Sequence, residues 1–81
     1  QMLNGNACRQ AAQSLRITNR VNNPNWSVVV ASARATLHRF YAEESERNKK
    51  ILRENPRYGA RAIKANERDC DDLVAALREI D

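Results

Sequence analysis

Two cysteines, Cys8 and Cys70, lie near opposite ends of this 81-residue chain. Each falls at an apolar position of a helical pattern, so both are expected in the core. A bond between them would close a loop over most of the molecule and stabilise it by about 4 kcal/mol. Because a chain of this length buries only about 60–65% of its unfolded surface, a cross-link of this kind is expected. We therefore predict a Cys8–Cys70 disulfide, with two buried free thiols, an inter-chain bond or a reactive thiol as the alternatives.

The composition favours a helical protein with few turns. Glycine and proline occur only twice each, and Ala, Arg, Asn, Glu and Leu dominate. No stretch approaches the roughly 18 apolar residues that a membrane span requires. We predict a single all-α domain, residues 1–81, that does not cross a membrane.

The clearest helical pattern lies at the end of the chain. Ile63, Cys70 and Leu77 repeat every seven residues, and the positions between them complete a packing seam: Asn66, Leu73 and Ile80. Asparagine is a favoured N-cap and proline a favoured first helical residue, so Asn55-Pro56 predicts where this helix starts. The third helix is expected over residues 56–80.

A second helix is expected over residues 26–54, after a turn-prone run around Pro24. Its first half carries an apolar stripe made of Trp26, Val30, Ala33, Leu37 and Phe40. The stripe then continues onto Glu44 and Arg47, so we expect a buried first half and a solvated second half. In that second half, the i,i+4 spacing predicts ion pairs of Glu43 with Arg47 and of Glu46 with Lys50.

A first helix is expected over residues 6–17, with Asn4-Gly5-Asn6 as its start signal. Its apolar positions are mostly small: Leu3, Ala7, Cys8, Ala11, Ala12 and Leu15. Short connections place neighbouring helices antiparallel, which predicts a three-helix antiparallel bundle. In this register Cys8 and Cys70 lie at levels that agree within roughly 6 Å along the bundle, which allows the disulfide.

The same register leaves a long hairpin, residues 43–68, protruding without the first helix beside it. This segment is strongly basic, because Arg47 to Lys64 holds seven basic residues and one acidic residue, Glu54. Two helices cannot cover all its apolar side chains, so some face a partner or solvent. We predict a partner-binding surface at its end, formed by Lys50, Ile51, Leu52, Arg53, Arg57, Tyr58, Arg61 and Lys64.

These features predict a small interaction module that binds a protein partner, or a second copy of itself as a dimer, through this basic and partly apolar surface. The disulfide predicts a secreted or periplasmic location. The alternative function is binding of nucleic acid or another anionic surface by the same basic residues. A third interpretation is that the Lys and Arg residues only provide solubility.

An enzyme is not expected, nor is a cofactor or a metal ion. The carboxylates form two clusters on helix faces without an apolar pocket, and the chain has no phosphate loop or nucleophile elbow. A site of His38 with the cysteines is conceivable, but a half-buried, hydrogen-bonded His38 is the simpler interpretation. Asn25-Trp26-Ser27 matches a glycosylation acceptor and equally a helix cap. The start at Gln1 is expected of a processed or trimmed chain.

Overall fold

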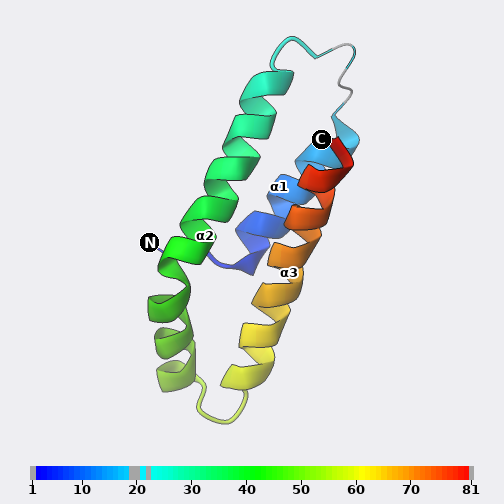
Figure 1. The fold of residues 1–81 in the computed structure, drawn as a ribbon. Helices are drawn as coiled ribbons and strands as arrows, with labels where there is room; N and C mark the ends of the chain where they lie inside the picture. Colours follow the sequence, from blue (N-terminus) through cyan, green and yellow to red (C-terminus); the bar gives the residue numbers. More distant parts are fainter. Residues whose placement is uncertain (1, 19–20, 22, 81) are drawn as a thin grey trace.

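Three α-helices make up the fold in the computed structural model, which describes residues 2–18, 21 and 23–80. They are α1 (Gly5–Ile17), α2 (Trp26–Glu54) and α3 (Gly59–Ile80), and the described residues include no strand. As Figure 1 shows, α1 and α3 run in the same direction and α2 runs against both. The all-α, three-helix prediction is confirmed. Gln1, and Asn22 of the turn-prone run, lie outside the described residues.

The start of α1 follows the sequence signal. The side chain of Asn4 accepts a hydrogen bond from the backbone N–H of Ala7 at 3.3 Å, as an N-cap does. At the start of α2, Asn25 stands at the N-cap position without a side-chain capping bond. Its own N–H donates to Asn23 Oδ1 at 2.8 Å. The polar turn before α2 is therefore held by Asn23.

The connection between α2 and α3 is a tight turn. The backbone N–H of Asn55 donates to the Ile51 carbonyl at 2.8 Å and ends α2. The N–H of Tyr58 then donates to the Asn55 carbonyl at 3.2 Å. Because this turn takes up residues 55–58, α3 begins at Gly59, three residues later than predicted.

The core is built from all three helices. It contains eight of the predicted apolar positions and one further residue, Ala76: Cys8, Ala12, Leu15, Ala33, Phe40, Cys70, Leu73, Ala76 and Leu77. Trp26, Val30 and Leu37 are partly buried against it. The predicted seam positions Ile63, Asn66 and Ile80 are only half-buried. Phe40 and Leu73 are the largest fully buried side chains. The centre of the core therefore lies at the level of these two residues.

The parallel helices α1 and α3 approach each other closely at Gly5. Its N–H donates to Asn66 Oδ1 at 2.9 Å, and a methyl group in place of the glycine hydrogen would lie 2.6 Å from Asn66 Cα. Asn66 therefore occupies an otherwise apolar seam because it binds the first residue of α1. At the other end of α1, Arg16 forms an ion pair with Asp72 at 2.8 Å.

The molecule is long and narrow, with extents of 46 × 18 × 17 Å. Its radius of gyration is 14.0 Å, compared with about 12 Å for a compact chain of this length. The length comes from α2 and α3, which continue together beyond the start of α1 (Figure 1). Among the described residues, no helix has the length and apolarity that crossing a bilayer would need.

Candidate functional site

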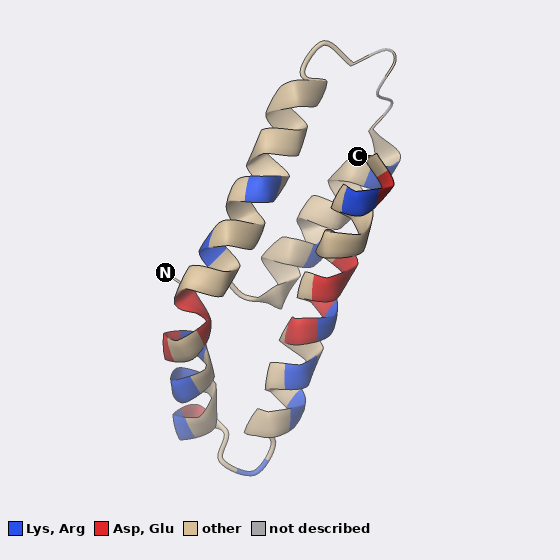
Figure 2. Ribbon diagram, viewed as in Figure 1, with Lys and Arg blue, Asp and Glu red and all other residues tan. Residues whose placement is uncertain are grey.

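The eight residues predicted to bind a partner all lie on residues 50–64, here called the hairpin end. Lys50, Ile51, Leu52 and Arg53 lie in the last turns of α2, Arg57 and Tyr58 in the turn, and Arg61 and Lys64 in the first turns of α3. All are exposed except Ile51, which is half-buried. Figure 2 shows Lys and Arg gathered here, away from α1. The structure thus brings the eight residues together at one end of the molecule.

The hairpin end exposes two large apolar side chains, Leu52 at 47% and Tyr58 at 57%. Leu52 lies across the start of α3, since a methyl group at Gly59 would come within 2.9 Å of its Cδ2. The guanidinium carbon of Arg57 lies 5.6 Å from the centre of the Tyr58 ring, within range of a cation–π contact. Aromatic and arginine side chains of this kind provide much of the binding free energy in protein interfaces.

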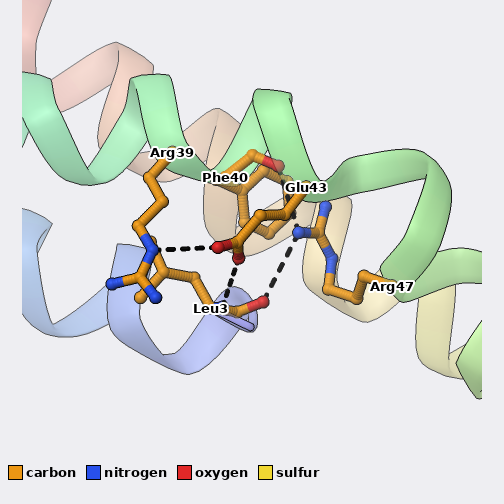
Figure 3. Close-up of polar contacts among 5 residues, drawn as sticks. All are labelled: Leu3, Arg39, Phe40, Glu43 and Arg47. Carbon is orange, nitrogen blue, oxygen red and sulfur yellow. Dashed lines mark hydrogen bonds and ion pairs between the residues drawn. The ribbon is translucent and has the colours of Figure 1, made fainter. Parts of the chain in front are cut away.

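The base of the hairpin is partly covered by the segment before α1. The N–H of Leu3 donates to Glu43 Oε2 at 2.6 Å, and the Leu3 carbonyl accepts a bond from Arg47 Nη1 at 3.4 Å (Figure 3). We predicted that the hairpin protrudes uncovered from residue 43. The segment that leads into α1 in fact lies against this stretch of α2 and, through Met2, Leu3 and Asn4, borders a hollow that reaches Ile51 and Glu54. On α3 the predicted uncovered span also ends early, because Gly5 binds Asn66.

Arg47 is buried, with 4% of its surface exposed, so the predicted solvated second half of α2 is wrong at this residue. Its guanidinium carbon lies 3.6 Å from the centre of the Phe40 ring, and Nη1 donates to the Phe40 carbonyl at 3.0 Å. Nε is buried without a hydrogen-bond partner among the described residues. Arg47 is therefore part of the packing and contributes nothing to the basic surface of the hairpin end.

The ion pairs of α2 also differ from the predicted ones. Glu43 pairs with Arg39, whose Nε lies 2.9 Å from Oε1, and Glu46 pairs with Lys49 at 3.4 Å. Glu43 was predicted to pair with Arg47, but that side chain extends over Phe40 instead (Figure 3). The hydrogen bond from Arg39 and then the one from the Leu3 N–H hold the pKa of Glu43 below its usual range.

Cys8 and Cys70 are both buried and both free thiols, so the predicted disulfide is absent from the structure. The register places them together, because Cys8 follows Gly5 and Cys70 follows Asn66 by about one turn on parallel helices. The two sulfurs are nevertheless not bonded, and the Cys70 thiol is hydrogen-bonded to Tyr41 of α2. Burial raises the pKa of Cys8 to about 11 and raises that of Cys70 as well.

A groove with an acidic rim lies between α2 and α3, above the hairpin end. It is lined by Phe40, Tyr41, Glu44, Glu67, Cys70 and Asp71, and 52% of Tyr41 is exposed. The hydrogen bond to Cys70, burial and then the charges of Cys70, Asp71 and Glu44 raise the pKa of Tyr41 to about 12. Glu44 and Asp71 were predicted to lie in two separate solvated clusters, and Glu67 in neither, whereas the antiparallel packing of α2 and α3 brings the three together across one groove.

His38 is exposed, contrary to the half-buried prediction, and lines a shallow apolar hollow with Leu37 and Tyr41. It lies on the outer side of α2, since the inner side is occupied by Ala33 and Phe40. Within the described part of the chain, no three His, Cys, Asp or Glu side chains are placed to hold a metal ion.

Comparisons of this chain with protein families, with curated proteins and with solved structures find no match. A function for it must therefore be argued from the surface just described.

Proposed function

We propose that this chain is a small helical interaction module that binds a protein partner, or a second copy of itself, through the hairpin end. The surface combines exposed apolar side chains, Leu52 and Tyr58, with surrounding cations such as Arg53, Arg57 and Arg61. Interfaces commonly have this arrangement, in which apolar and aromatic residues lie at the centre and polar or charged ones at the rim.

One observation carries the proposal: the chain exposes more surface than a compact protein of its mass. The accessible surface is 5796 Å², whereas a compact 9.2 kDa monomer exposes about 4,900 Å². The excess, about 900 Å², is close to the roughly 800 Å² that each partner buries in an interface of standard size. The two-helix extension beyond α1 accounts for the elongated shape, which favours the hairpin end as the place where a partner binds.

The test is a binding measurement with matched apolar-to-acid variants. Leu52→Asp places a charge on the hairpin end, and Val28→Asp places the same charge at a side chain that is 64% exposed elsewhere on α2. A partner captured by the native chain should be lost with Leu52→Asp and with Tyr58→Ala, and kept with Val28→Asp. Equal capture by all four proteins would contradict the proposal. Circular dichroism of each variant shows whether it is folded.

A second candidate function is binding of nucleic acid or of an anionic membrane surface, favoured by the exposed cations gathered at the hairpin end (Figure 2). Such binding weakens steeply with salt, because each phosphate contact releases counterions. Titration with a short DNA duplex and with phosphatidylserine vesicles tests it. Affinity that falls with added salt and with Arg57→Glu plus Arg61→Glu would support this function. Affinity that does not change with salt would exclude it.

The predicted secreted or periplasmic location belongs to the same proposal and depends on whether Cys8 and Cys70 become oxidised. A bond between them is supported by their position at the same level of two parallel helices. It is not supported by the structure itself, in which both thiols are free and buried. Intact mass of the isolated protein with and without reductant tests it. A mass that rises by two hydrogens on reduction would support an oxidising compartment, and an unchanged mass would remove this argument for it.

A further inference from the structure

The α2–α3 hairpin has one side that contacts α1 and a second side that is turned away from it. The contacts of α1 and of the segment before it fall on Glu43 and Arg47 of α2 and on Asn66 and Asp72 of α3. The side chains turned the other way recur at helical spacing along both helices. What is here called the outer face consists of the groove residues Tyr41, Glu44, Glu67 and Asp71 and of the positions that continue them at helical spacing: Asn48 and Leu52 on α2, and Ile63 and Val74 on α3.

The outer face changes character along its length. Its middle holds the acidic groove, where Glu44, Glu67 and Asp71 surround the half-exposed ring of Tyr41. Toward the turn the side chains become apolar and then basic, ending at Tyr58 with Arg57 beside it. Figure 2 shows the same change from acidic to basic along the lower part of both helices. One chain thus carries both members of a complementary pair of surfaces.

The distance between the two surfaces suits an antiparallel pair of hairpins. The turn and the groove are separated by about 13 residues of α2, or roughly 20 Å at 1.5 Å per residue. If two copies lie antiparallel with their outer faces in contact, each turn reaches the groove of the other copy. The two-fold axis then passes near residues 48–51 of α2 and Ile63 of α3, which lie about midway between turn and groove. Each Ile63 would then lie near its counterpart, as a self-complementary two-fold interface requires.

We infer that the partner of the hairpin end is a second copy of this chain, arranged antiparallel, with the basic turn of each copy on the acidic groove of the other. This inference rests on the proposed function and specifies its partner. The resulting core of four antiparallel helices would cover Leu52, Ile63 and Tyr41 of both copies, as in a four-helix bundle. The pairing of Arg57 with Glu67 and Asp71 fixes which end meets which.

A charge-swap experiment by sedimentation equilibrium tests the arrangement. One variant carries Arg53→Glu and Arg57→Glu at the basic turn, and the other carries Glu67→Lys and Asp71→Lys at the groove. All four residues are exposed or half-exposed and lie outside the core. In either variant alone, like charges face each other at both contacts of the dimer. In an equimolar mixture, both contacts of the mixed dimer are again of opposite sign.

The native chain should associate from 9.2 kDa to twice that mass with rising concentration, and added salt should weaken the association. Each variant alone should dimerise at least tenfold more weakly, and the mixture should recover most of the loss. A native chain that stays monomeric at millimolar concentration would overturn the inference, as would variants that dimerise normally or a mixture that does not recover. A monomeric native chain would leave the proposed function standing if the Leu52→Asp and Val28→Asp comparison still separates binding to another protein.

Discussion

The guanidinium of Arg47 lies over the ring of Phe40, with its central carbon 3.6 Å from the ring centre, although the two residues are seven positions apart on one helix. The contact joins the core to the base of the hairpin, because Arg47 also donates to the Leu3 carbonyl ahead of α1. Phe40 is itself 1% exposed. The orientation of the hairpin relative to the bundle thus depends on a buried cation.

Replacing Arg47 should destabilise the fold. Arg47→Ala removes the ring contact and the bonds to two carbonyls, at a cost of about 2–3 kcal/mol in the free energy of unfolding. Arg47→Met keeps an apolar chain over Phe40 and removes the unpaired Nε, so it should cost about 1 kcal/mol or less. Urea denaturation measures both. Arg53→Ala, at an exposed position of the same helix, is the control and should change stability by less than about 0.5 kcal/mol.

A methyl group at Gly5 should separate α1 from α3. Gly5→Ala places the new carbon 2.6 Å from the Asn66 backbone, and the backbone shift should cost about 1–3 kcal/mol. Gly59→Ala meets the flexible end of Leu52 first, at 2.9 Å, and its gain in helix propensity offsets part of that strain. Thermal unfolding should therefore show a clear loss for Gly5→Ala and a smaller change for Gly59→Ala. Equal losses would mean that the close approach at Gly5 is unimportant.

Glu43 should make the stability of the fold depend on acid. Its pKa is lowered in the folded chain by Arg39 and by the Leu3 N–H. The stabilisation is therefore complete above the unfolded pKa and is lost as the pH falls through the folded one. Glu43→Gln keeps an oxygen for Leu3 but removes the charge. The native chain should be more stable than Glu43→Gln at pH 7. The difference should begin to shrink as the pH falls below the ordinary glutamate pKa of about 4.3 and should disappear below the lower, folded pKa. A difference independent of pH would show that the charge is not involved.

The helices, and the side of each helix that faces the core, could be predicted because they follow from local sequence signals. Asn55-Pro56 marks where α2 ends, and the seven-residue repeat of Ile63, Cys70 and Leu77 marks the buried side of α3. The clustering of basic residues at the hairpin end follows from the position of one turn. These features require only periodicity and capping.

The remaining features depend on contacts between helices. Arg47 lies on the same helical stripe as Phe40, and this position was the one sequence signal that it could be buried. The burial of Arg47 also depends on the Leu3 carbonyl, which only tertiary packing brings near it. The level of the two cysteines could be predicted, whereas the hydrogen bond between Cys70 and Tyr41 depends on the packing of α3 against α2. The acidic groove combines carboxylates from two helices, so no single segment of sequence reveals it.

The two thiols should be unreactive in the folded protein. With a pKa of about 11 for Cys8, the thiolate is on the order of a thousandth of the thiol at pH 8, and burial blocks access to both sulfurs. A disulfide-exchange reagent should label the native chain slowly and should label both cysteines at once in denaturant. Rapid labelling of the native chain would show that the pair is more accessible than the structure indicates. No labelling in denaturant would indicate that the pair is already oxidised.

Most side chains of the hairpin end are exposed in a single chain, and we propose that they become covered when the chain binds. Hydrogen exchange tests this most directly, on dilute chain and again at high chain concentration or with a bound partner. In dilute chain, amides 51–54 and 61–64 should exchange at least about tenfold faster than amides 70–77, and binding should slow the first two groups alone. Protection of the hairpin end equal to that of the core in dilute chain would contradict the account.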